Sequence, residues 1–428
     1  FISVLVSDDF AVSITPFMPG DDNIFACEVL SAEINRSIEK NDLKSSNRDL
    51  LRDCAVDGDA CYYLRFDPEA ETGQTAKGEI VIEQIDNTKV YFGNPYTHEV
   101  AGQPYIIFEM RKHVDVLKAQ MSDKDGFDLD QIKPDNADGD NSEDLVTVLV
   151  KLYMEGGTVW YTEVIRESVI TPPTNTEYRR YPVAYMCWER VKNSCHGQSA
   201  VEGLLPNQKA VNTLMAAAIA HTQNNGFPIT FFDTNKLDAM PGGAALSVGV
   251  RGNPNDAFAT SYRAGDMSSQ VMQLVTSIVD LTKDLMGASD AALGNIKPDN
   301  TSAIVAVQRA TAAPLDLQRK AEYKLIEDVV RIKADIISVR YGKRYISTSK
   351  LSDEIRPIDE DGKEIPMVEF DFSVFKDMVH EIKVDIGASA YFSELMQLQT
   401  LDNLLSRGII TDAITYLEAL PDFALRHK

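Results

Sequence analysis

The chain has 428 residues, of which 44% are hydrophobic and 25% are charged, so it has enough apolar material for two or three folded regions. Its 42 basic and 65 acidic side chains give a net charge of −23, whereas a protein that grips nucleic acid normally presents a basic face. The acid excess argues against a nucleic-acid gripper. Two explanations of the negative charge stay open: it keeps the protein soluble, or it lines a channel and repels DNA that slides through.

The N-terminal part, 1–197, is predicted to combine helices and strands. Apolar residues recur at helical spacing over 22–53, and Asp57-Gly58 ends this pattern. Residues 122–144 are rich in Asp, Asn and Gly and are expected to form a solvated loop, and Pro172-Pro173 is expected to break the chain. The predicted strands are short alternating runs between turn residues, at 61–66, 79–82, 89–92, 105–108, 146–154, 159–165 and 181–188.

A helix is predicted over 198–226, because apolar residues between Leu204 and Ile219 keep helical spacing. Gln208 and Asn212 lie four residues apart near the same stripe. Amides on a packing face favour a helix that meets other protein through hydrogen bonds, as in a ring of subunits. A surface helix with two exposed amides explains the pattern equally well.

The segment after this helix, 227–267, is rich in turns and contains a strand signal, so it is predicted to be a small β-containing insert. Residues 268–286 have one apolar and one polar stripe and are predicted to form a second helix, which ends at Gly287. The small residues, glycines and proline of 287–301 are typical of a loop that approaches another surface closely.

The C-terminal part begins with a long predicted helix at 302–341. Pro314 lies inside it and is expected to kink it, because proline removes a backbone hydrogen bond and clashes with the preceding turn. Short strands and turns are predicted over 342–390, and two short helices over 391–428. A helix of this length, broken once, is too extended for the core of a compact enzyme domain.

Motifs for catalysis or cofactor binding are absent from the sequence, which contains no P-loop, no G-x-G-x-x-G and no H-E-x-x-H. Gly197-Gln198-Ser199-Ala200-Val201 misses the G-x-S-x-G pattern at its last position. The five cysteines form no C-x-x-C pair and are expected to be buried and reduced, and the six histidines are scattered. We therefore expect no catalytic residues, no metal site and no cofactor. No apolar run reaches the roughly 18 residues that span a bilayer, so no membrane segment is expected.

Several local strings carry a resemblance to one known family. The Gly197-Gln198-Ser199 step precedes a helix with Gln208 and Asn212, small residues fill 287–295, and Gln308-Arg309-Ala310 lies on the long helix. The segments 384–389 and 399–405 add to this resemblance. Together with the order of elements, these strings resemble the portal proteins of tailed bacteriophages, and the last two resemble portals of phages that infect Gram-positive bacteria.

The resemblance implies an elongated α+β subunit of portal type. In family terms its regions are wing (1–197), first stem helix (198–226), clip (227–267), second stem helix (268–286), tunnel loop (287–301), long tunnel helix (302–341), returning wing strands (342–390) and crown helices (391–428).

The resemblance also implies a ring of about twelve subunits at one vertex of the capsid, through which double-stranded DNA is packaged and ejected. The implied partners are further copies of the chain, DNA, the terminase large subunit, the head–tail adaptor and the major capsid or scaffolding protein. The implied location is the virion, with the host cytoplasm during assembly.

Candidate residues toward DNA follow from the same resemblance. Lys297 is the first, beside Asn295, Asp299 and Asn300 of the tunnel loop, and Lys283 near the end of the second stem helix is another. A solvated surface charge is the alternative for each lysine. Pro314 is expected to bend the long helix from the channel toward the wing. The rival functions are another ring-forming virion connector, a metal-dependent enzyme acting on nucleic acid, and an intracellular scaffold or binding protein.

Overall fold

The computed structural model confirms a mixed α+β chain and divides it into two compact units. The body unit comprises Phe1–Ala200 and Leu315–Lys428, and the helix-pair unit comprises Val201–Pro314. The described residues are 2–5, 10–18, 20–74, 76–122, 129–135, 144–166, 168–225, 229–236, 247–252, 259–262, 269–285, 315–348, 351, 357, 365–376, 378 and 380–386.

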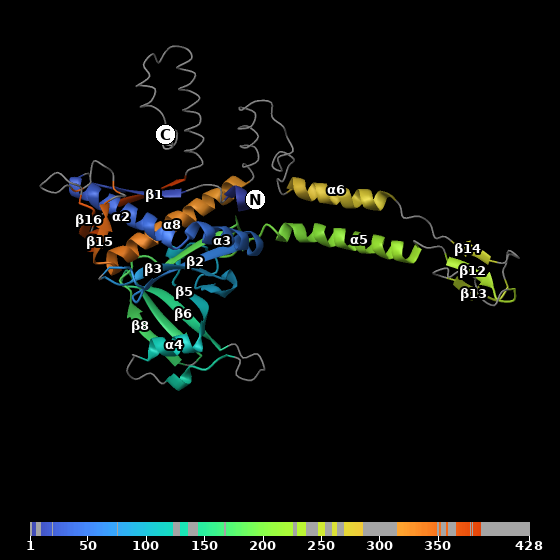
Figure 1. The fold of residues 1–428 in the computed structure, drawn as a ribbon, viewed down its shortest axis with the longest axis horizontal. Helices are drawn as coiled ribbons and strands as arrows, with labels where there is room; N and C mark the ends of the chain where they lie inside the picture. The colour runs from blue at the N-terminus through green and yellow to red at the C-terminus, as the bar shows by residue number, and fades with distance from the viewer. Residues whose placement is uncertain are drawn as a thin grey trace, which may run out of the picture. The chain divides into compact units, whose positions relative to one another are not determined.

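The long helices of the body unit lie together with β1, β15 and β16 beside them, whereas β5, β6, β8 and the short α4 lie at the opposite end of the unit (Figure 1). The helices are α1 (Ile2–Leu5), α2 (Asp21–Lys40), α3 (Leu43–Asp57), α4 (Val114–Met121) and α8 (Asp316–Arg340). Where one helix was predicted over 22–53, there are two, because Asp42 adopts a left-handed conformation (φ 46°) that ends α2 and starts α3.

A five-stranded antiparallel sheet forms one layer of the body unit. Its strands, in spatial order, are β4 (Val90–Phe92), β5 (Tyr105–His113), β6 (Leu145–Glu155), β7 (Thr158–Ile165) and β8 (Ser168–Asn175). Alternation in β6 follows the pleat, since Val146, Val148, Val150 and Leu152 are all buried.

Pro172-Pro173 was predicted to break the chain, and that prediction was wrong. Both prolines lie inside β8, which is the edge strand of the five-stranded sheet. An edge strand can hold prolines because one side of its backbone needs no partner. The pairing of β7 with β8 is irregular around Tyr161 and Glu163, where the register shifts.

The other sheets of the body unit join distant parts of the chain. A three-stranded sheet has the order β3 (Glu79–Ile85), β2 (Asp59–Asp67) and β9 (Val183–Cys187). Three two-stranded pairs are β1 (Phe10–Pro16) with β17 (His380–Ile386), β10 (Glu189–Arg190) with β11 (Gly197–Gln198), and β15 (Lys343–Ser347) with β16 (Met367–Asp371). The first pair links the two chain segments of this unit, and no local pattern in the sequence indicates this pairing.

The core of the body unit lies between its long helices and the sheet of β2. Helix α8 contacts α2, β2 and β9 and buries Leu325, Val329 and Ile336. Leu30 and Ile34 of α2 are fully buried in the same cluster. This core fixes α2, α8 and β3 against one another, and so positions the charged groups described below.

The helix-pair unit contains two helices and a small sheet. The helices are α5 (Leu205–Asn225) and α6 (Ser269–Leu285), and they contact each other. The sheet has β12 (Ile229–Asp233) at its centre, parallel to β13 (Ser247–Val250) and antiparallel to β14 (Ala259–Tyr262). A β-containing insert between two helices was predicted here, and the structure confirms the strands. The long helix is described only from Asp316, so the predicted kink at Pro314 lies outside the described residues.

Candidate interaction surface and buried charge cluster

Helices α5 and α6 pack through one stripe of small and branched residues on each. On α5 the less exposed positions include Val211, Leu214 and Ala218, which recur at spacings of three and four. The side-chain amide of Asn207 donates to Thr282 Oγ1 at 2.9 Å and ties the two helices together. This packed stripe uses only part of the apolar surface of α5.

A second apolar stripe of α5 is exposed. Leu205, Met215 and Ile219 are 47%, 38% and 54% exposed, and they share a helix face with Gln208 and Asn212 at spacings of three and four. The amide of Gln208 donates to Asn212 Oδ1 at 2.9 Å, so the two predicted amides satisfy each other on this face. We call this face the α5 stripe.

Helix α6 also exposes large apolar side chains. Met272 and Val279 lie seven residues apart on one face, and Leu274 and Leu281 lie seven apart on another. Lys283, one of the predicted DNA-facing residues, follows Val279 by one turn and is exposed, with Asp280 Oδ1 at 3.8 Å. Its cation therefore stands at the end of an apolar face.

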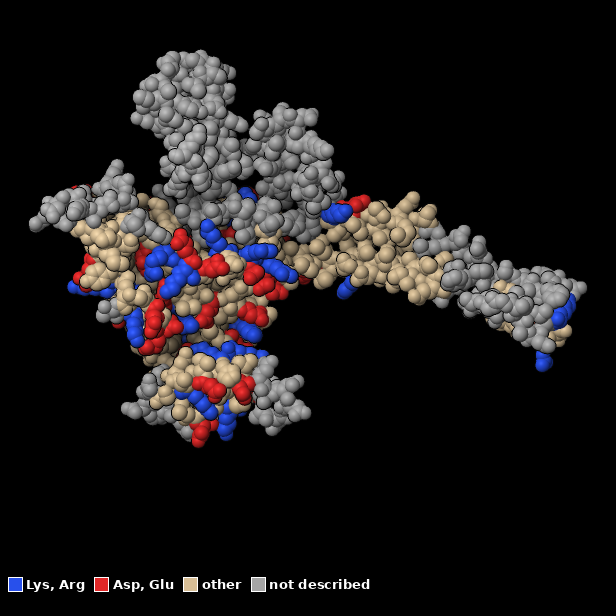
Figure 2. Space-filling model, in the orientation of Figure 1, with Lys and Arg blue, Asp and Glu red and all other residues tan. Residues whose placement is uncertain are grey.

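Charge is sparse on the described part of the helix pair. Figure 2 shows the surface of these helices as almost entirely uncharged, whereas acidic and basic side chains crowd the body unit. Helix α5 carries Lys209 as its one Lys, Arg, Asp or Glu, and α6 carries Asp280, Lys283 and Asp284. These four charges cancel, although the chain as a whole has a net charge of −23.

Several predicted site residues lie outside the described residues: Asn295, Lys297, Asp299, Asn300 and Pro314. Gln208, Asn212 and Lys283 are described and belong to the helix pair, with all three exposed. Whether these three meet a second copy, as predicted for the two amides, or DNA, as predicted for Lys283, stays a prediction.

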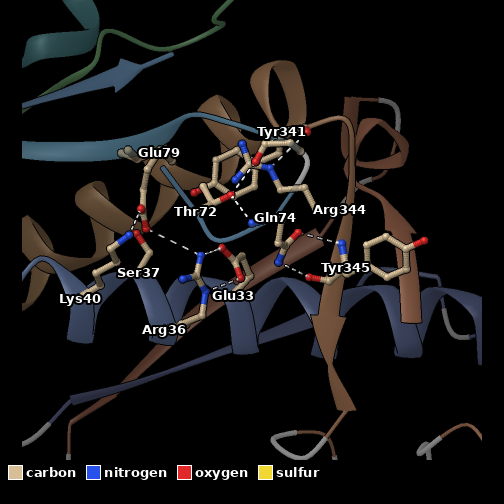
Figure 3. A network of polar contacts seen from close by, with 12 residues as sticks. Glu33, Arg36, Ser37, Lys40, Thr72, Gln74, Glu79, Tyr341, Arg344 and Tyr345 are labelled. Atoms are coloured by element: carbon tan, nitrogen blue, oxygen red, sulfur yellow. Dashed lines mark hydrogen bonds and ion pairs between the residues drawn. The ribbon is translucent and has the colours of Figure 1, made fainter. Parts of the chain in front are cut away.

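A cluster of buried charges joins α2, β3 and α8 in the body unit (Figure 3). Glu33 and Glu79 are 8% and 5% exposed. Arg36 Nε donates to Glu33 Oε2 at 2.9 Å, and Lys40 forms an ion pair with Glu79. Lys333 of α8 is fully buried, and its amine donates to Ser37 Oγ at 2.9 Å.

The amine of Lys333 has little stabilisation of its charged form. Burial lowers its pKa to about 7, and the nearby carboxylates of Glu33 and Glu79 offset only part of that effect. Those carboxylates already have Arg36 and Lys40 as partners. Lys333 can therefore lose its proton near neutral pH without leaving either carboxylate unpaired.

Arg344 of β15 extends the cluster toward the loop before β3. Its guanidinium lies 3.7 Å from the ring centroid of Tyr341 and donates to the carbonyls of Gly78 and Lys77 at 2.8 and 3.2 Å. Burial lowers the pKa of Arg344 and raises that of Tyr341. These contacts attach the returning C-terminal strands to the N-terminal part of the chain.

Gly58 lies where α3 ends and β2 begins, and its backbone packs closely against Gly197. It has φ +100°, and a Cβ there would lie 2.6 Å from the carbonyl oxygen of Gly197. Asp59 is 3% exposed and accepts from the backbone N–H of Gly197 at 2.5 Å, and its other oxygen lies 2.7 Å from His196 Nδ1. The carboxylate therefore holds the loop between β10 and β11 in place.

Sequence reasoning missed the exposed character of Leu205, Met215 and Ile219, because it assigned all apolar residues of this helix to one stripe. The signal was present, since two separate stripes at spacings of three and four can be drawn on α5. The burial of Glu33 and Lys333 could not be predicted in this way, because both occupy positions that are typical of the polar face of an amphipathic helix.

Comparisons with known protein families and with curated sequences find no match to this chain. Among the described residues, no group of three or more His, Cys, Asp or Glu side chains is placed to hold a metal ion. The helices of that same part are not long and apolar enough to cross a membrane. All five cysteines are free and buried, as predicted, and burial raises the pKa of each thiol.

Proposed function

We propose that the chain is a portal-type subunit, which forms a ring around a channel for double-stranded DNA at one vertex of a phage capsid. One observation carries the proposal: the helix pair is poor in charge and exposes large apolar side chains on both helices. Contiguous apolar surface of this kind marks an interface in a soluble protein. The resemblance of the sequence to portal proteins supplies the kind of assembly.

A second copy of the chain fits this surface better than an unrelated partner. Two copies that each carry a charge of −23 repel each other, so they associate best through faces without net charge. The four charges of α5 and α6 cancel, which makes the helix pair such a face.

The geometry of such a contact favours a ring. The exposed residues of α5 differ from those of α6, because the α5 stripe combines Leu205 and Ile219 with two amides, whereas α6 presents Leu274 and Leu281. A contact between the α5 face of one copy and the α6 face of the next is heterologous, and heterologous contacts that close produce rings. Helices with so few cations also offer DNA few tight phosphate contacts along a channel.

The remaining partners follow from the proposed ring. The small sheet of β12, β13 and β14 has two edge strands whose outer backbone groups can pair with another chain. The terminase and later the head–tail adaptor would dock there, and the body unit would face the capsid or scaffolding protein.

Negative-stain electron microscopy of the purified chain tests this proposal. We expect rings of about twelve copies with an open centre, and no Mg²⁺-dependent cleavage of added DNA. A monodisperse single chain over the whole accessible concentration range, with or without DNA, would contradict the proposal. Nuclease activity that survives in every purification fraction would instead favour a nucleic-acid enzyme.

A further inference from the structure

A polar hollow of about 480 Å³ lies on the body unit, between the loop 96–99 and the loop 190–194. The first loop follows β4, and the second begins at β10 and leads to β11. The backbone N–H of Cys195 donates to the carbonyl of Pro95 at 2.8 Å, which joins the two walls.

Buried side chains hold both loops in place through hydrogen bonds. The amide of Gln103 is buried; its oxygen accepts from the backbone N–H of Asn94 at 2.8 Å, and its nitrogen donates to the carbonyls of Asn94 and Thr97 at 3.2 and 2.8 Å. Asp59 holds the opposite loop through Gly197. A ligand that binds here does not have to order the loops first, which lowers the entropic cost of binding.

The side chains of the hollow carry excess positive charge. Arg190 and Lys192 line it together with one carboxylate, Glu99. Among the described residues, no carboxylate lies within ion-pair distance of either cation. Arg190 and Lys192 therefore give the lining of the hollow a net positive charge, in a chain with 65 acidic and 42 basic side chains.

His98 completes the arrangement. Arg190 Nη2 lies 3.2 Å from His98 Nδ1, and because a guanidinium only donates, Nδ1 must accept and the imidazole must be neutral. Burial lowers the pKa of His98, the cations of Arg190 and Lys324 lower it further, and Glu99 opposes them. An anion bound in the hollow beside both side chains would oppose this effect, because its negative charge favours the protonated imidazole of His98.

We propose that this hollow binds a phosphate group, with Arg190 and Lys192 as the main cations and His98 as a third donor once protonated. Arginine presents paired donors that match the oxygens of phosphate, and lysine adds a compact charge. The volume exceeds that of one phosphate, so the group belongs to a larger molecule or binds with water. The phosphate comes either from a small phosphorylated ligand or from the backbone of a nucleic acid.

Equilibrium dialysis of the full chain against radiolabelled inorganic phosphate at low ionic strength tests the site. The double variant Arg190→Gln/Lys192→Gln should lose at least about tenfold in affinity, since two charge-assisted contacts disappear. The control Arg166→Gln/Lys343→Gln makes the same change in net charge at two exposed positions away from the hollow, and it should bind like the wild type. Equal binding by the two double variants, or no binding by the wild type, would overturn the proposal.

Two further arms identify the source of the phosphate and the part played by His98. Displacement of phosphate by a short thymidine oligonucleotide would assign a nucleic-acid backbone, whereas phosphate binding without displacement would assign a small ligand. For the pH arm the probe is sulfate, which keeps its two charges across the range. Sulfate should bind more tightly as pH falls through the pKa of His98. In His98→Asn, which keeps an acceptor for Arg190 and cannot titrate, that dependence should vanish. An unchanged dependence would remove His98 from the site.

Discussion

The body unit buries several ionisable groups in hydrogen bonds and ion pairs beside its apolar core. In the helix-pair unit, apolar side chains of the two helices reach the surface and charges are few. Glu33 and Glu79 illustrate the first arrangement, and Leu205 and Ile219 illustrate the second. A buried carboxylate needs a partner within the chain, whereas a row of exposed apolar side chains on a helix with few charges marks a surface that another molecule can cover. Under the proposed function, the body unit folds within one chain and the helix pair is completed by assembly.

The largest expected effect is on assembly, from charges placed on the α5 stripe. Leu205→Glu/Ile219→Glu should convert rings to single chains, because each carboxylate would be buried unpaired in the contact between copies. The control Val116→Glu/Val374→Glu replaces two apolar side chains of similar exposure in the body unit. Mass photometry at matched concentration should find rings for the control alone. Rings of unchanged mass in the stripe variant would show that this face is not an interface.

In the body unit, the largest expected effect on stability is at Gly58. Gly58→Ala should destabilise the fold by about 3 kcal/mol or more, because a Cβ strains the backbone at φ +100° and collides with the carbonyl of Gly197. Gly73→Ala is the matched control, since Gly73 has φ +74° but open space around it, and it should cost only about 1 kcal/mol. Urea unfolding measures both. Equal losses would mean that the close approach to Gly197 contributes nothing.

From the burial of Lys333 we expect a smaller effect on the free energy of unfolding, with a distinct pH dependence. Its pKa is about 7 in the folded chain, against 10.5 for an ordinary lysine, so between these values the unfolded chain binds more protons. The free energy of unfolding should therefore rise as pH increases from 7 toward 10. Lys333→Met should flatten this rise and stabilise the chain by about 1–3 kcal/mol at pH 7, because it removes a poorly solvated amine.

Lys320→Met serves as the control for Lys333→Met. Lys320 lies on the same helix but is 68% exposed and paired with Asp316. Its replacement should leave the slope of stability against pH unchanged. A wild-type slope that is already flat between pH 7 and 10 would contradict a neutral buried amine.

The smallest expected effect concerns the two amides of the α5 stripe. Gln208→Ala/Asn212→Ala should change the stability of the single chain by about 0.5 kcal/mol or less, because the bond between these side chains is exposed. In the assembled ring the same variant should lower the unfolding temperature measurably, because polar groups of the neighbouring copy that bond to these amides would lose their partners. An equal shift for single chains and rings would place the amides outside the contact.

Much of the fold could be predicted from local pattern. The alternation of Val146, Val148 and Val150 marked β6, and the helical spacing from Leu204 to Ile219 marked α5. Features that depend on distant partners could not be predicted. The pairing of β1 with β17 joins residues far apart in sequence, and Pro172-Pro173 is acceptable only because β8 lies at an edge.

The sites show the same division. Gln208 and Asn212 were singled out because amides on an apolar stripe are unusual, and the structure places them on an exposed face. The burial of Lys333 arises from α2 and β3, and the hollow beside Arg190 arises from two loops about 90 residues apart. Neither arrangement leaves a local signal in the sequence, because the partners meet only after folding.

Thiol labelling on the α5 stripe tests most directly whether assembly covers the helix pair. All five native cysteines are buried with raised pKa values, so a single new cysteine in Met215→Cys reports its own surroundings. In the assembled protein we predict labelling by a maleimide at least about tenfold slower than in the same variant carrying Leu205→Glu/Ile219→Glu. Labelling at the same fast rate in both proteins would contradict the account, because the exposed stripe would then be open to solvent in the native state.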